Sequence, residues 1–334
     1  MKLSLILPCY NVERYVRDCL DSIYVQDYPE SDFEVICVND SSTDNTLSII
    51  SEFEKKHSNL RIINHSYNRT LGGARNTGLE NARGEYLWFI DPDDLIRPGC
   101  LHELLESVEQ RPADIVLFNY EVVDKDNRHI RSNQLFDDSD LLDGQTFIEK
   151  YTNDAIYVHC IVWRCLFRNE FIRKNGLMFP VMRKGADDAF QLRAMLLAVR
   201  VYSVKKEFYL YRSNPYSVSR KTHKAQVVFA DRIVNAYQYH IMLRDLPDIR
   251  EGIRGKIVEM IRWFVNSTPS VLRKLSFNER HLYYDAIRDN RSEIKELYQY
   301  MNRKCRALFS TKDGRYLWSI KVIALLWIEH IHRR

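Results

Sequence analysis

Short apolar runs alternate with helical patterns from residue 3 to residue 119, and this alternation constrains the fold more than any other feature of the chain. The apolar runs, each long enough for one strand, occupy residues 3–7, 34–38, 60–64, 86–90 and 115–119. Patterns with apolar residues at helical spacing fall between them, at residues 12–25, 47–53, 74–82 and 98–110. Strands interleaved with helices of this length indicate an α/β fold with a doubly wound, mostly parallel sheet. We expect Asn11 to cap the first helix and Ser42 or Thr43 to cap the second.

The alternation loosens after about residue 124. Helical patterns cover residues 162–175 and 190–199, and residues 201–211 are typical of one or two strands. From His223 onward the pattern is almost entirely helical. A chain of 334 residues has room for one large α/β domain and an appendage. We therefore expect one domain at residues 1–220 and a mostly helical extension at residues 221–334.

Composition argues against several classes of protein. The net charge of +4 is too small to indicate a nucleic-acid binder. The seven cysteines are odd in number and contain no Cys-x-x-Cys pair, which favours free thiols in a reducing compartment over a disulfide framework or a zinc site. The first apolar run is too short for a signal peptide. These observations predict a cytoplasmic protein.

The C-terminal segment, residues 303–334, has a strong positive charge. It contains eight Lys or Arg residues against two acidic residues, a net charge of +6. An apolar stripe at helical spacing runs from Leu317 to Ile331 and is shorter than the ~20 residues that a spanning helix needs. A basic amphipathic helix of this kind can lie on an anionic membrane surface, or it can dock its stripe on the protein itself. We favour the first reading, with the protein peripheral on the inner face of the cytoplasmic membrane.

Acidic side chains follow two of the predicted strands directly. Asp40 follows the strand at 34–38, and Asp91, Asp93 and Asp94 follow the strand at 86–90. The carboxyl ends of strands are where open α/β sheets bind ligands. Burying several acids together is costly unless a cation or a proton neutralises them, and hard oxygen ligands suit Mg²⁺ or Mn²⁺. The alternatives are a helix cap at Asp40 and a solvated Asp-Pro-Asp-Asp turn.

Two further segments carry candidate residues. Leu71-Gly-Gly-Ala-Arg-Asn-Thr-Gly78 is predicted to be a flexible loop leading into a helix, with Arg75 near a bound phosphate. It is neither a Walker A loop nor a Gly-x-Gly-x-x-Gly fingerprint. Asp187 and Asp188 follow Gly185 closely, and either a helix cap or a general base would suit that position.

Taken together and in order, these motifs resemble family 2 of the inverting GT-A glycosyltransferases. The matching segments are Pro-x-Tyr-Asn at residues 8–11, Asp-Ser-Ser-Thr-Asp at 40–44, Gly-Gly-x-Arg-Asn-x-Gly at 72–78, Asp-x-Asp-Asp at 91–94 and Asp-x-x-Phe at 187–190. The resemblance covers about residues 1–220. It implies a Rossmann-like GT-A domain, a nucleotide-sugar donor that is most often UDP-linked, and a divalent cation, Mn²⁺ or Mg²⁺.

The resemblance also implies a role for each matching residue. The donor-binding residues would be Pro8, Tyr10, Asn11, Asp40, Arg75, Asp91, Arg212 and Ser217. Among them, Tyr10 and Asp40 would hold the base, Arg75 would lie near the phosphates, and Arg212 and Ser217 would approach the diphosphate. Asp93 would be the direct metal ligand, with Asp91 beside it, and Asp187 would be the catalytic base.

Two positions depart from the family pattern. Asn39 stands where an Asp is common, and Ala186 stands where a Glu usually precedes the base. Loss of that Glu would lower the pKa of Asp187 or shift the role of base to Asp188. We expect an inverting glycosyltransferase that extends a saccharide or lipid-linked acceptor in surface polysaccharide synthesis. The alternative is a non-catalytic, membrane-attached module that binds a nucleotide sugar or a polysaccharide.

Overall fold

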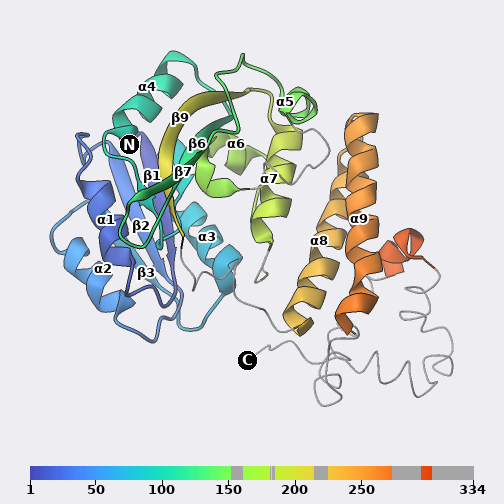
Figure 1. Cartoon of the computed structure of the whole chain (residues 1–334), viewed down its shortest axis with the longest axis horizontal. Helices are drawn as coiled ribbons and strands as arrows, with labels where there is room; N and C mark the ends of the chain where they lie inside the picture. The colour runs from blue at the N-terminus through green and yellow to red at the C-terminus, as the bar shows by residue number, and fades with distance from the viewer. Residues whose placement is uncertain (152–160, 181, 183–184, 214–224, 273–294, 303–334) are drawn as a thin grey trace. The chain divides into compact units, whose positions relative to one another are not determined.

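The computed structural model describes residues 1–151, 161–180, 182, 185–213, 225–272 and 295–302 (Figure 1). The chain divides into two compact units. The first comprises Met1–Val181 and Ala186–Arg220, and the second comprises Met182–Gly185 and Lys221–Arg334. Each unit is described by itself below.

The first unit is built from alternating strands and helices. In chain order its elements are β1 (Leu3–Cys9), α1 (Val16–Tyr24), β2 (Phe33–Asn39), α2 (Thr46–Glu54), β3 (Leu60–Asn64), α3 (Thr70–Asn81), β4 (Tyr86–Phe89), β5 (Leu95–Ile96), α4 (Cys100–Gln110), β6 (Ile115–Val123), β7 (His129–Asn133), α5 (Gly144–Tyr151), the 3₁₀ turn η2 (Val162–Arg164), β8 (Cys165–Arg168), α6 (Asn169–Lys174), α7 (Ala186–Leu197) and β9 (Val201–Arg212).

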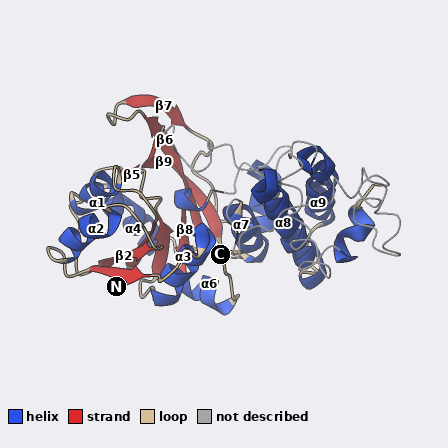
Figure 2. Cartoon of the chain, turned by 90° about the horizontal axis from the view of Figure 1, so that it is seen from below, coloured by secondary structure: helices blue, strands red, loops and turns tan. Residues whose placement is uncertain are grey.

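The described strands form one nine-stranded sheet, in the order β3-β2-β1-β4-β8-β6-β9-β5, with β7 paired to β6 (Figure 2). Strands β3, β2, β1 and β4 are parallel neighbours, and β6 and β9 are also parallel. Strand β8 runs antiparallel between β4 and β6. The sheet is therefore mixed but mostly parallel in its first half, which confirms the predicted α/β class and the GT-A architecture.

Side chains of β1 alternate between the two faces of the sheet, as a strand requires. Leu3, Leu5 and Leu7 join the core that also contains apolar residues of α1, α2 and α4. Ile6 points to the opposite face, where its side chain fills the space that any side chain at Gly78 of α3 would need. Helices α1 and α2 thus cover one face of the first strands and α3 covers the other (Figure 1).

Four predictions about the first half of the chain were wrong in whole or in part. Helix α1 begins at Val16 rather than near residue 12, and Asn11 does not cap it, because Asn11 has a φ of 52° and lies five residues before the helix. Asn45, not Ser42 or Thr43, precedes α2. Residues 71–73, predicted as a loop leading into the helix at 74–82, already lie inside helix α3, which begins at Thr70.

Later in the chain, the pattern at residues 162–175 is not one helix. It divides into the 3₁₀ turn η2, the buried strand β8 and the short helix α6. The strand predicted at residues 115–119 continues to Val123 and forms a hairpin with β7. Residues 201–212 form the single strand β9, which is twelve residues long.

The second unit contains two long helices, α8 (Ala225–Asp245) and α9 (Glu251–Leu272), and the 3₁₀ turn η3 (Tyr298–Tyr300). His240 of α8 contacts the Tyr300 hydroxyl at 3.1 Å and the Glu296 carboxylate at 3.1 Å, which ties the segment around η3 to the helix. No helix in the described ranges is both long enough and apolar enough to cross a membrane. The basic segment 303–334 lies outside the described residues.

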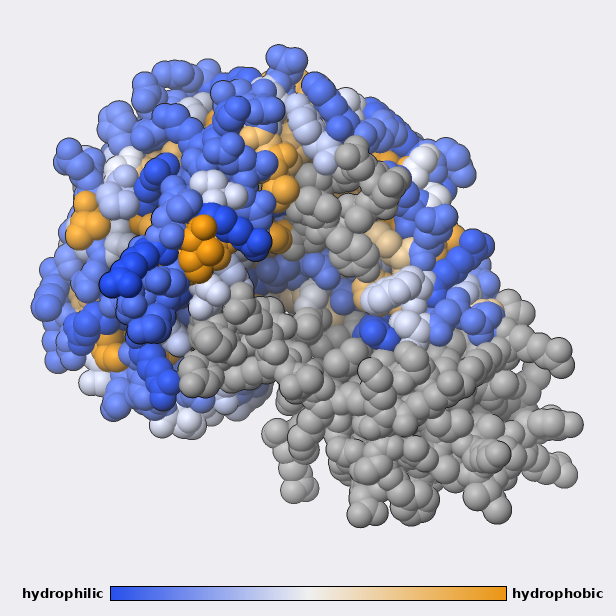
Figure 3. Space-filling model, viewed as in Figure 1, coloured by the Kyte–Doolittle hydropathy of each residue, from blue (hydrophilic) through white to orange (hydrophobic). Residues whose placement is uncertain are grey.

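The surface of the described residues is mostly hydrophilic in the view of Figure 3, with small, scattered apolar groups. The largest exposed apolar side chains include Val25, Tyr67, Val199 and Trp263, which come from separate elements. Single exposed apolar residues are normal for globular proteins and carry no argument about partners.

Candidate active site

Several of the candidate residues lie at the carboxyl ends of the parallel strands. Strand β1 lies between β2 and β4, so the strand order reverses beside it. Crevices at such reversals are the usual ligand sites of open α/β sheets. Tyr10 and Asn11 follow β1, Asp40 follows β2 and Asp91 lies two residues beyond β4. The Asp40 N–H donates to the Cys9 carbonyl at 2.8 Å, which joins two of these strand ends.

Loops after β1 and β2 are fastened to each other by side chains. The Asn11 Oδ1 accepts from the Thr43 N–H at 2.8 Å, and the Val12 N–H donates to the Thr46 Oγ1 at 2.9 Å. Asn11 and Ser41 both have positive φ, 52° and 62°. Such conformations are costly for residues other than glycine and persist only where the surroundings hold them. Asn11 therefore holds the loop after β1 against the loop after β2, beside the candidate site.

Arg75 joins two of the predicted acids. Its guanidinium, which is fully buried, donates to the Asp91 Oδ1 at 2.8 Å and to the Asp187 Oδ1. Burial lowers the pKa of Arg75, but the charges of Asp187 and Asp91 outweigh that effect and raise it overall. The guanidinium of Arg75 therefore links Asp91, which lies beyond β4, to Asp187 at the start of α7. Arg75 was expected near a phosphate, and in this structure its partners are carboxylates.

The segment that was predicted as a loop lies in α3, and its contacts with the chain before α7 position Arg75 and Asp187 for this ion pair. Gly72 lies against the carbonyl of Pro180 and the side chain of Ala186, so that any side chain at position 72 would collide with that backbone. Asn76 exchanges two hydrogen bonds of 2.8 Å with the backbone of Phe179. Because Ala186 is buried at this close approach, a longer side chain there would push α7 away from α3. Helix α3 thus fixes where α7 begins.

Asp187 has the electrostatics of a group that can take up a proton. Its removal from water raises its pKa above the ordinary value, and the charge of Asp91 adds to that shift, while Arg75 opposes it. A carboxylate with a raised pKa is a stronger base than a solvated one. Its side chain is still 22% exposed, so a ligand can reach it. Asp188, the alternative base, is also partly buried in the first turn of α7.

Asp94 has a structural role. It is buried, its Oδ2 accepts from the Tyr209 hydroxyl at 2.8 Å and its Oδ1 accepts from the Arg212 N–H at 2.8 Å. The Tyr209 hydroxyl in turn accepts from the Asp91 N–H at 3.1 Å. Burial and then the charges of Asp93 and Asp91 hold the pKa of Asp94 well above its usual range. These bonds fasten the Asp-Pro-Asp-Asp turn to β9.

Asp91 and Asp93 fit the predicted divalent cation. Both supply the hard carboxylate oxygens that Mg²⁺ and Mn²⁺ prefer, and their effect on Asp94 shows an excess of negative charge at this turn. Within the described residues, no group of three or more His, Cys, Asp or Glu side chains is arranged to hold a metal. Metal binding by Asp91 and Asp93 therefore stays a prediction.

Asp40, the predicted base-binding residue, is held by side chains that the sequence analysis missed. Its Oδ1 contacts the His65 Nδ1 at 2.6 Å and accepts from the Arg69 N–H at 2.7 Å. His65 immediately follows β3, so the rule that found Asp40 and Asp91, a polar residue just beyond a strand, would also have found it. No such rule points to Asn76 or Tyr209, because their partners are distant in sequence.

The remaining predicted residues are placed as follows. Pro8 is buried within β1, and the Tyr10 side chain is 48% exposed, so its ring is open to a stacking partner. Arg212 is buried and forms an ion pair with Asp18 of α1 at 3.1 Å, and Tyr15 lies under its guanidinium. Ser217 lies outside the described residues.

A hollow of about 520 Å³ lies at the opposite, amino end of the sheet. It is lined by Gly84, Glu85, Arg168, Asn169, Glu170, Arg173 and Lys174. Its polar groups are used internally: Arg173 and Asn169 donate to backbone carbonyls after α3, and Arg168 pairs with Glu170 at 2.9 Å. None of the predicted site residues lines it.

Comparison with known proteins identifies the family of the chain. A family model, Glycosyl transferase family 2, matches residues 4–176. An uncharacterized glycosyltransferase of Bacillus subtilis, EpsJ, is 32% identical over 317 residues, which cover 83% of this chain and 90% of EpsJ. The poly(ribitol-phosphate) beta-glucosyltransferase of Bacillus spizizenii is 30% identical over 265 residues; the match covers 77% of this chain but only 39% of that protein.

The fold itself has relatives among solved structures. The crystal structure of S. aureus TarS 1-349 in complex with UDP-GlcNAc superposes with a TM-score of 0.66, at 22% identity, over 98% of this chain and 90% of that one. At this identity the likeness establishes the fold alone. The family model and the relationship to EpsJ establish more: the chain belongs to glycosyl transferase family 2.

Proposed function

We propose that the chain transfers a sugar, with inversion, from a nucleoside-diphosphate donor to a hydroxyl group of a saccharide acceptor. The observation that carries this proposal is the contact of one buried guanidinium, that of Arg75, with both Asp91 and Asp187. It brings a carboxylate of the Asp-x-Asp segment to the carboxylate best suited to act as a base, as a single displacement requires.

The donor is a UDP-sugar in this proposal. Asp40 accepts an N–H of the base, and the exposed ring of Tyr10 provides a face for stacking. The TarS structure named above contains UDP-GlcNAc, which supports a uridine nucleotide by analogy. The diphosphate lies toward Asp91 and Asp93, and Arg212 and Ser217 stay candidates for binding it.

Asp187 is the general base. It takes the proton from the acceptor hydroxyl while that oxygen attacks the anomeric carbon and the bond to the diphosphate breaks. Arg75 holds the carboxylate in position and stabilises it until the acceptor arrives. Asp91 and Asp93 would hold Mn²⁺ or Mg²⁺, which would supply positive charge to neutralise the departing diphosphate.

The acceptor is a saccharide, in free or lipid-linked form, of a bacterial surface polysaccharide. The relative from Bacillus spizizenii is named for transfer to poly(ribitol-phosphate), a polymer of the cell surface. The basic segment 303–334 supports a place on the anionic inner face of the cytoplasmic membrane, where lipid-linked acceptors are found.

Replacement of Asp187 by Asn tests the proposal. General base catalysis contributes about 10²–10⁴-fold, so kcat should fall by that factor, while the Kd for UDP should stay within about twofold. Steady-state transfer and calorimetric titration of UDP measure the two quantities. Asp188→Asn is the matched control from the same helical turn and should retain most activity. Turnover near that of the unaltered protein in Asp187→Asn would contradict the assignment.

Hydrolysis of the donor distinguishes the proposed enzyme from the alternative, a non-catalytic binding module. Glycosyltransferases slowly hydrolyse their donor without an acceptor, because water can take the acceptor's place. A panel of nucleotide sugars with Mn²⁺ should therefore show release of free UDP that is lost in Asp187→Asn and on addition of EDTA. Binding of a nucleotide sugar with no hydrolysis and no transfer would favour the binding module.

A further inference from the structure

A chain of hydrogen bonds lies behind Asp40. The His65 Nδ1 contacts the Asp40 Oδ1 at 2.6 Å, and the His65 Nε2 contacts the Thr77 Oγ1 at 2.9 Å. Arg69 adds its backbone N–H to the same carboxylate oxygen at 2.7 Å, and its guanidinium donates to the Thr77 hydroxyl at 3.3 Å. The side chains of Asp40 and His65 are only 3% and 6% exposed, so this arrangement is part of the packed interior.

His65 and Arg69 both contact the same oxygen of the Asp40 carboxylate, Oδ1. An ionised carboxylate only accepts, so the His65 Nδ1 carries a hydrogen and donates it to Oδ1, as the Arg69 N–H does. Among the described residues no hydrogen bond reaches Oδ2. These contacts fix the rotation of the carboxylate, with Oδ1 hydrogen-bonded within the protein and Oδ2 without a hydrogen bond from the described residues.

We propose that His65 is a positioning residue, which orients the Asp40 carboxylate so that Oδ2 selects a base carrying a ring N–H and thereby sets the preference of the donor site for uracil over cytosine. This inference rests on the proposed function, in which Asp40 binds the donor's base. Uracil presents N3–H to an acceptor, whereas cytosine presents a lone pair at N3 that a fixed carboxylate oxygen repels. A carboxylate that is free to rotate or to withdraw would discriminate less.

Two substitutions separate the contacts of the imidazole. In Asn the amide nitrogen is as many bonds from Cβ as Nδ1 is in His, so His65→Asn keeps a donor for Asp40 and loses the contact with Thr77. In Gln the amide oxygen and nitrogen are as many bonds from Cβ as Nε2 is in His, so His65→Gln can keep a contact with Thr77 through either atom and loses the donor for Asp40. The two variants thus lose different contacts, and only His65→Gln loses the contact with Asp40 that the proposal concerns.

The readout is the ratio of the Kd for CDP to the Kd for UDP, measured by calorimetry on the full chain with Mg²⁺ present. Loss of one hydrogen bond to Asp40 should lower this ratio about fivefold in His65→Gln, while His65→Asn should stay within about twofold of the unaltered protein. A merely structural role would weaken both nucleotides equally and leave the ratio unchanged. An unchanged ratio in His65→Gln, or an equal fall in both variants, would overturn the proposal.

Thermal unfolding shows whether each variant is folded. If His65→Gln does not fold, His65→Ala, which also removes the donor to Asp40, takes its place and should lower the ratio about fivefold. Thr77→Val and His65→Asn keep that donor and are expected to keep the ratio within about twofold. A fivefold fall in the ratio for either of these folded variants would contradict the assignment to the Nδ1 contact.

Asp40→Asn distinguishes failure of this inference from failure of the proposed function. An amide can donate to N3 of cytosine, so this variant should bring the two affinities together or reverse their order. If Asp40→Asn leaves the ratio unchanged, Asp40 does not bind the base and the proposed donor site is wrong. If Asp40→Asn changes the ratio and His65→Gln does not, the donor site stands and only the role of His65 is wrong.

Discussion

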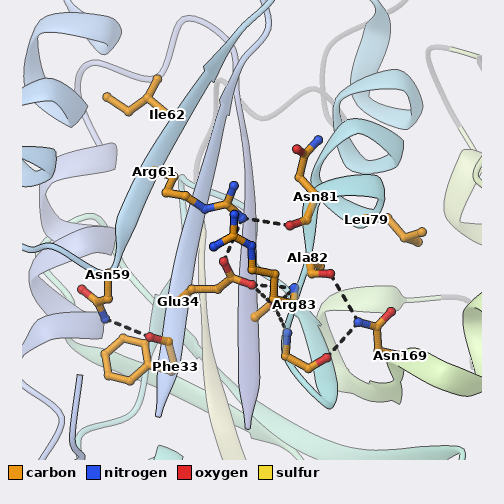
Figure 4. Close-up of polar contacts among 12 residues, drawn as sticks. Phe33, Glu34, Asn59, Arg61, Ile62, Leu79, Asn81, Ala82, Arg83 and Asn169 are labelled. Carbon is orange, nitrogen blue, oxygen red and sulfur yellow. Dashed lines mark hydrogen bonds and ion pairs between the residues drawn. The ribbon is translucent and has the colours of Figure 1, made fainter. Parts of the chain in front are cut away.

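The two ends of strand β2 each hold a buried carboxylate, and the surroundings of the two groups differ. Glu34, at the amino end, accepts from the Ser4 hydroxyl at 2.7 Å, the Arg83 N–H at 2.6 Å and the Arg61 guanidinium at 2.8 Å (Figure 4). Both of its oxygens are therefore satisfied within the protein. Asp40, at the carboxyl end, is bonded at Oδ1 alone within the described part of the chain.

The contrast extends to the neighbours of each group. Burial works to raise the pKa of Glu34, but the hydrogen bonds from Ser4, Arg83 and Arg61 outweigh it, so that the pKa lies below its ordinary value. At the carboxyl end, burial raises the pKa of both Asp94 and Asp187. At the amino end the hydrogen bonds stabilise the ionised form of Glu34, as a structural network does. At the carboxyl end the ionised forms of Asp94 and Asp187 are destabilised, and binding of a cation or a proton would lower their free energy.

Loss of Arg75 should have the largest effect on this comparison. Arg75→Ala leaves Asp91 and Asp187 without their shared partner, and removal of one member of a buried ion pair costs about 3–5 kcal/mol. The free energy of unfolding, measured with urea, should fall by that amount, and transfer activity should be lost. Arg75→Lys, which keeps the charge but not the two-sided geometry, should recover part of the stability and little activity.

A small change in stability on loss of Arg75, with activity retained, would show that the ion pair is incidental. It would also remove the physical link between the Asp-x-Asp segment and the base.

The amino end should respond in stability alone. Glu34→Gln replaces a charge-assisted acceptor with an amide, which cannot accept from all three donors, and should cost about 1–3 kcal/mol. The kcat of the folded variant should remain within about twofold of the unaltered protein, because no described contact joins Glu34 to the acids at the other end. A tenfold fall in kcat in the folded protein would break the proposed division of roles.

The smallest expected effect is on the pH dependence of stability, and it has opposite signs for Glu34 and Asp187. The pKa of Glu34 is lowered on folding, so its contribution to stability is present above the ordinary glutamate pKa of about 4.3 and is lost as pH falls through the folded value. The difference in Tm between the unaltered protein and Glu34→Gln should therefore shrink in acid. A difference that is constant down to about pH 3 would contradict this.

The pKa of Asp187 is raised on folding, so the contribution of this group to stability is present in acid and is lost as pH rises through the folded value. Activity should rise over the same interval as the base loses its proton. Profiles of kcat and of Tm against pH, each compared with Asp187→Asn, measure both. Activity that falls as Asp187 ionises would contradict its role as base.

Much of the first half of this fold could be predicted from the sequence. Strands β1, β2 and β4 are buried on both faces and consist largely of apolar residues, and the acids just beyond β2 and β4 pointed to the carboxyl end of the sheet. Strand β8 could not be predicted, because a buried four-residue strand has no period that separates it from a helix. The central contact of the site was also hidden, since Arg75 meets Asp91 and Asp187 across 16 and 112 residues of sequence.

The most direct test of the account is a crystal structure with UDP and Mn²⁺, using the anomalous signal of the metal. The account predicts a manganese peak beside Asp93 and Asp91, with the uracil ring against Asp40. Nucleotide or metal bound instead in the hollow beside Arg168 and Arg173, with the carboxyl end of the sheet empty, would contradict it.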